Sequence, residues 1–143
     1  MSSTARTINS AAQMEELGSE IGSTLKVGDL IVLRGELGAG KTTFTRGLGR
    51  ALGIEGVTSP TFVISKIYPG VIPLVHVDAY RLMGNELALF DDLDLESRIP
   101  NSVTVIEWGG DFVGRLVDSY LAIDIEFGSG VDERVVKIES VSR

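Results

Sequence analysis

Residues 30–52 read LIVLRGELGAGKTTFTRGLGRAL. This segment begins with a short apolar run at residues 30–33, which is typical of a strand buried on both faces. It ends with a run at residues 41–52 in which Phe44, Leu48 and Leu52 recur at helical spacing. Between the two, residues 35–42 match the pattern G-x-x-x-x-G-K-[ST]. The segment therefore predicts a compact α/β fold of the P-loop NTPase class, with a mixed, mostly parallel sheet flanked by helices.

The chemistry of this loop suits a nucleoside triphosphate. Its glycines allow backbone angles at which successive N–H groups curl around phosphate oxygens, and the helix predicted to start near Lys41 adds the positive end of its dipole. Lys41 supplies a cation for the β and γ phosphates, and the Thr42 hydroxyl is suited to ligate Mg²⁺. A glycine-rich turn with a chance lysine is the alternative, but the flanking strand and helix argue against it. The predicted nucleotide contacts here are Gly35, Glu36, Leu37, Gly38, Ala39, Gly40, Lys41, Thr42 and Thr43. Because the chain has no Asn-Lys-x-Asp motif for reading guanine, we expect ATP.

Two acidic residues follow apolar, strand-like runs. Glu107 ends the run at residues 103–106, which is the pattern of a Walker B segment and predicts a second magnesium ligand. Asp78 ends the run at residues 74–77. We expect Asp78 either to orient the attacking water or to hold a magnesium-bound water, with a helix cap or a salt bridge to Arg81 as the structural alternative.

Two further polar residues lie near these runs. Thr61 follows Ser-Pro in a loop, where it either reaches the γ phosphate as a switch threonine does or belongs to a simple turn. His76 is the one histidine of the chain, and a lone imidazole on a strand is more often packed and hydrogen-bonded than catalytic. Asp78, Lys41 and Thr61 are therefore candidate catalytic residues, with the alternatives for Asp78 and Thr61 open at this point, and His76 is assigned no chemistry.

The remaining segments predict the elements that complete the domain. Hydrophobic periodicity and turn residues indicate an edge strand at 6–9, a helix at 11–25, a hairpin of strands at 61–68 and 71–77, one or two short helices within 85–98, a strand at 102–106 and closing strands at 120–127 and 134–138. The hairpin strands are expected to pair antiparallel around Pro69 and Gly70. Since the sequence has no internal repeat or linker, we expect a single domain over residues 1–143.

Composition narrows the class of protein. The chain has 143 residues, with 13 basic against 20 acidic ones and a net charge of −7, which argues against autonomous binding of nucleic acid. It has no cysteine, which excludes a disulfide framework, a thiolate metal site and thiol catalysis. Its apolar runs are far shorter than the ~20 residues that span a bilayer. We expect a cytoplasmic protein without a membrane partner.

Taken together, the motifs resemble those of a known family. Ser59-Pro60-Thr61-Phe62, the segment HVDAYR at residues 76–81 and Glu107-Trp108 follow the P-loop in the order and spacing typical of the TsaE (YjeE) family, the bacterial ATPase of tRNA threonylcarbamoyladenosine (t6A) synthesis. A P-loop alone is shared by very many proteins, whereas these additional elements together are specific. The resemblance covers nearly the whole chain.

The resemblance implies a role for each matching residue. Lys41 and the loop amides would bind phosphates, Thr42 with Glu107 would hold Mg²⁺, Asp78 would be needed for hydrolysis, and Thr61 would lie in a switch-like loop. It also implies nucleotide contacts from the N-terminal segment near Ala11 and from a basic residue in the late strands, here Arg134. In that family the ATPase assists a TsaD–TsaB heterodimer, meets tRNA only through that complex, and would be slow alone.

Two other classes of function stay open. A small-molecule P-loop kinase would share the loop, but it needs an arginine-bearing lid, and the stretch at residues 84–100 carries only Arg98 among many acids. A nucleotide-gated interaction module would bind ATP to set its affinity for a partner, without requiring hydrolysis.

Overall fold

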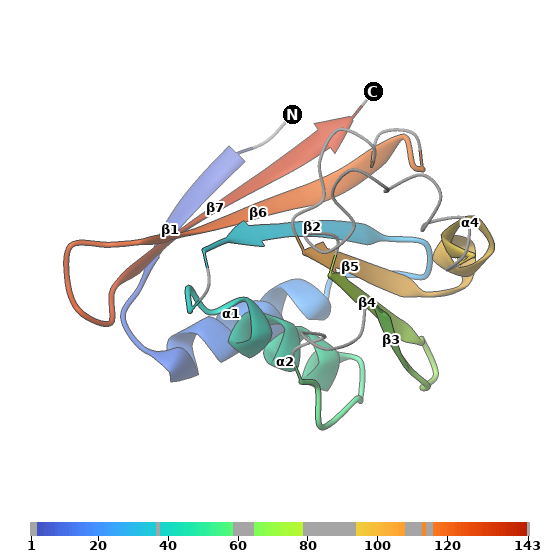
Figure 1. Cartoon of the computed structure of the whole chain (residues 1–143), viewed down its shortest axis with the longest axis horizontal. Coiled ribbons are helices and arrows are strands. Elements are labelled where there is room, and N and C mark those ends of the chain that lie inside the picture. Colours follow the sequence, from blue (N-terminus) through green and yellow to red (C-terminus); the bar gives the residue numbers. More distant parts are fainter. Residues whose placement is uncertain are drawn as a thin grey trace.

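The described strands form one seven-stranded sheet. The computed structural model describes residues 3–36, 38–58, 65–78, 94–107, 113 and 116–142. The strand order is β1-β7-β6-β2-β5-β4-β3 (Figure 1). The strands are β1 (Ser3–Ile8), β2 (Leu30–Gly35), β3 (Ser65–Tyr68), β4 (Leu74–Asp78), β5 (Val103–Glu107), β6 (Ser119–Phe127) and β7 (Arg134–Ser142). Five of them run in one direction, while β3 and β7 run in the other. The predicted α/β class, the mixed, mostly parallel sheet and the antiparallel β3–β4 hairpin are thus confirmed.

The helices lie on both sides of this sheet. Helices α1 (Ala11–Gly22) and α2 (Lys41–Ala51) pack together on one face, below the sheet in Figure 1, while α4 (Leu95–Arg98) and the 3₁₀ helix η2 (Ile99–Asn101) precede β5. Side chains of successive β2 residues point to opposite faces. Ile31 and Leu33 accordingly belong to the core under α1 and α2, and Leu30 and Val32 belong to the core on the other face. Both faces of β2 are covered, as its unbroken apolar run predicts.

Helices α1 and α2 approach each other closely at glycines. A Cβ atom on Gly47 would lie 1.9 Å from the carbonyl oxygen of Glu15, and one on Gly18 would lie 2.1 Å from that of Phe44. Both distances are far below van der Waals contact, so only glycine fits at these two positions.

Some boundaries differ from the sequence-based expectation. The helix predicted to reach Leu25 ends at Gly22. The hydroxyls of Ser23 and Thr24 donate to the carbonyls of Glu20 and Ile21, and such local bonds compete with helix continuation. The predicted hairpin strand at residues 61–68 is described only from Ser65 onward, and most of the predicted helical segment at 85–98 also lies outside the described residues. In the described ranges, no helix has the length and apolar character needed to cross a membrane.

Candidate functional site

The phosphate-loop segment connects the carboxyl end of β2 to the amino end of α2. Gly38 and Gly40 have positive φ angles of 83° and 116°, a conformation that glycine adopts without strain. The N–H of Ala39 donates to the carbonyl of Glu36 at 3.0 Å, which closes the loop as a turn. The first N–H groups of a helix have no partner within that helix and carry its positive dipole end. The N-terminus of α2 is therefore suited to bind an anion.

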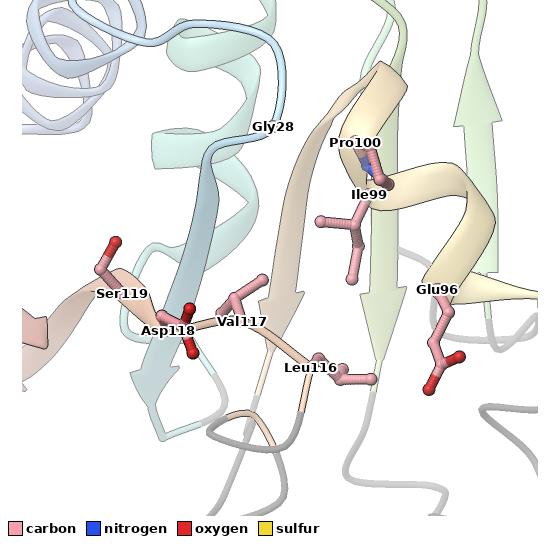
Figure 2. A pocket seen from close by; sticks show the side chains of 8 residues that line it. All are labelled: Gly28, Glu96, Ile99, Pro100, Leu116, Val117, Asp118 and Ser119. Carbon is pink, nitrogen blue, oxygen red and sulfur yellow. The ribbon is translucent and has the colours of Figure 1, made fainter. Parts of the chain in front are cut away.

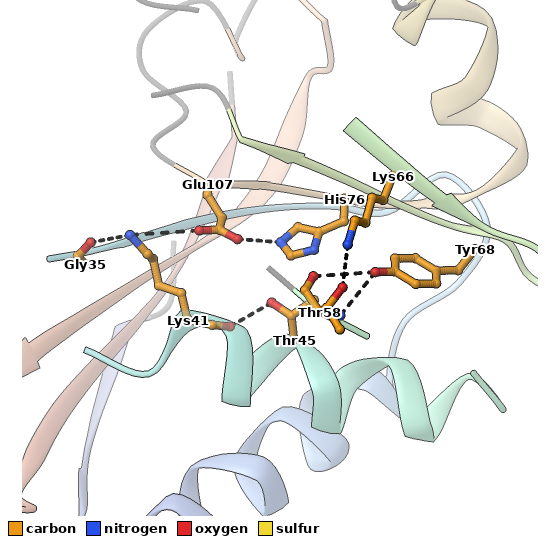
Figure 3. A network of polar contacts seen from close by, with 8 residues as sticks. All are labelled: Gly35, Lys41, Thr45, Thr58, Lys66, Tyr68, His76 and Glu107. Atoms are coloured by element: carbon orange, nitrogen blue, oxygen red, sulfur yellow. Dashed lines mark hydrogen bonds and ion pairs between the residues drawn. The ribbon is translucent and has the colours of Figure 1, made fainter. Parts of the chain in front are cut away.

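Lys41, the first residue of α2, turns back across this loop. Its Nζ donates to the carbonyl oxygen of Gly35 at 2.6 Å and lies 3.9 Å from Oε1 of Glu107 (Figure 3). Burial lowers the pKa of Lys41 from its ordinary value, while the negative charges of Glu107 and Asp78 oppose that shift. An ammonium group held in this way is a concentrated positive charge beside the loop amides.

The two predicted acids lie at the same edge of the sheet. Strands β4 and β5 are parallel, and their register pairs Asp78 with Glu107, while Glu107 also pairs with Leu33 of β2. Carboxyl ends of parallel strands meet at one edge, and ligand sites of α/β proteins lie there. The side chain of Glu107 is only 8% exposed, so its carboxylate is largely removed from water. The structure thus brings Asp78, Glu107 and Lys41 together although they are far apart in sequence.

His76 is a member of this group that the sequence analysis left without a role. Its side chain is fully buried, and its Nε2 lies 2.5 Å from Oε2 of Glu107. The carboxylate of Glu107 therefore lies between an ammonium group and an imidazole (Figure 3). The signal available in the sequence was strand periodicity, because His76 and Asp78 are two residues apart and so face the same side of β4.

Of the two predicted contacts distant from the loop in sequence, Arg134 contacts the loop directly, and Ala11 begins the helix whose Met14 approaches it. The Arg134 guanidinium donates to the carbonyl of Ala39 at 3.2 Å and of Gly38 at 3.5 Å, and it stands 4.6 Å from the centre of the Phe127 ring. Ala11 is the exposed first residue of α1. The start of this helix comes near the loop, since a Cβ on Gly40 would lie 3.2 Å from Cε of Met14.

The remaining predicted residues divide into two groups. Thr42 and Thr43 are half-buried in the first turn of α2, and Glu36 is exposed at the start of the loop. Leu37 and Thr61 lie outside the described residues, as do Arg81 and Trp108.

A bound magnesium ion would fit the donor set at this edge. Thr42 offers a hydroxyl and Glu107 a carboxylate, which are oxygen ligands of the kind that Mg²⁺ takes while keeping further positions for phosphate and water. Among the residues that the structure describes, no cluster of three or more His, Asp or Glu side chains forms a cage for a metal ion.

A separate hollow of about 540 Å³ lies at the opposite edge of the sheet (Figure 2). Its lining residues are Gly28, Glu96, Ile99, Pro100, Leu116, Val117, Asp118 and Ser119. Gly28 precedes β2 and Ser119 begins β6, so this hollow is at the amino ends of the parallel strands. It does not belong to the phosphate-loop site.

Comparison with known proteins gives one consistent result. The model of the family described as threonylcarbamoyl adenosine biosynthesis protein TsaE matches residues 8–136. The tRNA threonylcarbamoyladenosine biosynthesis protein TsaE of Streptomyces coelicolor is 51% identical over 121 residues, which cover 82% of this chain and 81% of that protein. The protein of the same description from Bacillus subtilis is 41% identical over 119 residues, covering 81% and 72%. The crystal structure of YdiB from Bacillus subtilis superposes with a TM-score of 0.77 at 31% identity, and the match covers 99% of this chain and 87% of that one.

Proposed function

The chain belongs to the TsaE family of threonylcarbamoyl adenosine biosynthesis proteins, and from this membership we propose that it binds and hydrolyses ATP in support of t6A formation on tRNA. Membership confirms the resemblance seen in the motifs. The observation that carries the proposed activity is the arrangement of Lys41, whose Nζ lies between the loop carbonyl of Gly35 and the carboxylate of Glu107. A largely buried cation at the amino end of a helix supports binding of a triphosphate.

In this proposal the residues of the chain divide the work of phosphoryl transfer to water. The amides of residues 35–43 and the Lys41 ammonium bind and orient the β and γ phosphates. Magnesium, held by Thr42 and Glu107, would neutralise phosphate charge. Asp78 orients the attacking water, and Thr61 also contributes to hydrolysis. Ala11 and Arg134 contact the nucleotide at the other side of the loop.

We propose that the partner of this ATPase is a TsaD–TsaB heterodimer, which forms t6A at position 37 of tRNA. With a net charge of −7, the chain is poorly suited to bind tRNA directly, so it would meet tRNA only through that complex. Hydrolysis would be slow alone, because the partner would supply order or charge that stabilises the transition state. This activity belongs in the cytoplasm.

The proposal is tested by measuring ATP hydrolysis with and without TsaD–TsaB. We expect slow release of phosphate by the chain alone and a clear acceleration by the heterodimer, with formation of t6A on added tRNA. Equal rates in the two conditions would contradict the proposed partnership. Transfer of the γ phosphate to a metabolite in preference to water would instead indicate a kinase.

Asp78→Asn separates an ATPase from a passive nucleotide gate. The amide has nearly the same shape but cannot act as a base, so hydrolysis should fall about 100-fold or more while ATP affinity is kept. If t6A formation continues unchanged in this variant, hydrolysis is not required and the gated module is the better description.

A further inference from the structure

We propose that His76 is a positioning residue for Glu107: its Nε2–H donates to Oε2 and holds the carboxylate so that Oε1 faces Lys41 and the phosphate loop. This inference rests on the proposed function, because Glu107 matters to nucleotide binding only if a magnesium–nucleotide complex binds there. In this inference His76 belongs to the site although it contacts neither the nucleotide nor the metal ion itself.

The strand register explains how His76 reaches Glu107. In the parallel β4–β5 pair, His76 lies opposite Val105 and Asp78 lies opposite Glu107. Residues paired across two strands share one face of the sheet, and residues two apart on a strand do so as well. His76 therefore lies on the same face as Glu107, two residues before the position that pairs with it. That face is the one covered by α1 and α2, since Val105 belongs to their core. The imidazole lies beside the carboxylate, on the side away from Lys41 (Figure 3).

The chemistry of its position argues against His76 as plain core filling. The neighbouring residues of this face, Leu74, Val103 and Val105, are fully buried and apolar. Burying a polar group among them costs free energy unless the group is hydrogen-bonded. Within the part of the chain that the structure describes, Nδ1 is buried without a partner, so the ring makes one hydrogen bond, to Glu107. An aliphatic side chain would fill the same space without that cost.

The direction of this hydrogen bond follows from the partner. A carboxylate oxygen accepts, so in this hydrogen bond Nε2 is the donor and carries a proton. The inference therefore requires a proton on Nε2 of the only histidine of the chain.

The consequence of this bond appears in the distances around Glu107. Oε2 is 2.5 Å from His76, whereas Oε1 is 3.9 Å from Nζ of Lys41, which is longer than a hydrogen bond. Without the imidazole, the carboxylate is free to turn toward the ammonium and shorten this ion pair to hydrogen-bond distance. That pair would neutralise the charge that the phosphates need and would withdraw the carboxylate from the metal. Residues that orient metal ligands through a hydrogen bond act in this way.

A first test reads the tautomer directly. Long-range ¹H–¹⁵N NMR of the tag-free, nucleotide-free protein reports the state of both ring nitrogens, and the single histidine makes assignment unnecessary. We expect a proton on Nε2. A ring whose Nε2 carries no proton would overturn the inference whatever the protein does with ATP.

A second test compares His76→Leu, which removes the donor, with His76→Gln, whose amide can still donate to Glu107. The readout is the affinity for a non-hydrolysable ATP analogue in magnesium and in EDTA. We expect the wild type to bind the analogue more tightly in magnesium than in EDTA. In His76→Leu the ratio of these two affinities should fall about ten-fold or more, whereas His76→Gln should keep most of it. Leu74→Val, on the same strand and face, is the control for lost packing. It should lower the thermal midpoint without changing the magnesium effect.

The outcomes separate this inference from the proposed function. If the wild type binds the analogue and His76→Leu keeps the full magnesium effect, or Leu74→Val loses it equally, the positioning role is wrong and the proposed function stands. If the wild type itself binds no nucleotide, the proposed function is wrong, and the positioning role falls with it.

Discussion

Lys41 experiences opposing electrostatic effects. Burial disfavours its charged form and lowers its pKa, while the carboxylates of Glu107 and Asp78 favour the charge. A bound triphosphate would bring further negative charge to the same ammonium. That charge would favour the charged form of Lys41 against the effect of burial.

Replacing Lys41 should accordingly weaken binding. Lys41→Gln removes the charge, and since hydrogen bonds to charged groups contribute about 1.5–3 kcal/mol, the affinity for Mg-ATP should fall about 10- to 100-fold. Isothermal titration calorimetry measures this change. The control is Arg46→Gln, which removes a positive charge from an exposed position of the same helix. Equal affinity in wild type and Lys41→Gln would refute the role given to Lys41.

At the scale of elements, the crossing of α1 and α2 depends on glycine. Gly47→Ala would place a methyl group 1.9 Å from the carbonyl oxygen of Glu15, so the helices must move apart. We expect the free energy of unfolding to fall by about 1–3 kcal/mol, although the higher helix propensity of alanine alone would raise it by about 1 kcal/mol. Urea denaturation measures the change, with Arg46→Ala as the exposed control on α2. If Gly47→Ala were more stable than the wild type, α1 and α2 would not approach each other as closely at Gly47 as the structure shows.

The loop between β6 and β7 is organised by one carboxylate. Glu133 accepts from the hydroxyl and the N–H of Ser129 and from the N–H of Gly130. These bonds lower the pKa of Glu133 below its ordinary value, and the Ser129 hydroxyl is the largest cause. The next residue, Arg134, contacts the carbonyls of the phosphate loop. An ordered turn at Glu133 therefore keeps Arg134 beside that loop.

This loop predicts a specific response to acid. Because the folded pKa is depressed, the stabilising effect of Glu133 is fully present above the ordinary pKa of a glutamate and disappears as pH falls through the lower, folded value. An NMR titration of the Glu133 carboxyl should give a pKa below the ordinary value of a glutamate side chain. Ser129→Ala should raise that pKa. A midpoint that Ser129→Ala leaves in place would mean that the hydroxyl bond does not form.

For the whole molecule, the site depends on the sheet being complete, because β2, β4 and β5 each end at it. A ligand bound across these ends should stabilise the native state as a unit. At a Mg-ATP concentration 100 times the dissociation constant, the free energy of unfolding increases by about 2.7 kcal/mol. This increase should raise the thermal midpoint by roughly 5–10 °C. Differential scanning calorimetry should show one transition, as expected for a single domain. Two transitions, only one of which shifts, would contradict that expectation.

Much of the fold was predictable because its signals are local. The apolar run of β2, the periodicity of α2 and the turn residues between β3 and β4 are patterns among near neighbours in sequence, and each predicted its element. The α1 boundary was less well predicted, since the hydroxyls of Ser23 and Thr24 end the helix through bonds that periodicity does not reveal. Within the site, the loop motif identified Lys41, but nothing local identified the partner of His76.

The sequence by itself therefore determined the strand, loop and helix around Lys41, since glycine spacing and hydrophobic period act within a few residues of each position. Only the tertiary structure decided which distant groups meet there. The approach of His76 to Glu107, of Arg134 to the loop carbonyls and of Gly47 to Glu15 all follow from strand pairing and helix crossing. Those contacts depend on register and packing across long stretches of chain, and a one-residue shift in register would turn His76 to the other face.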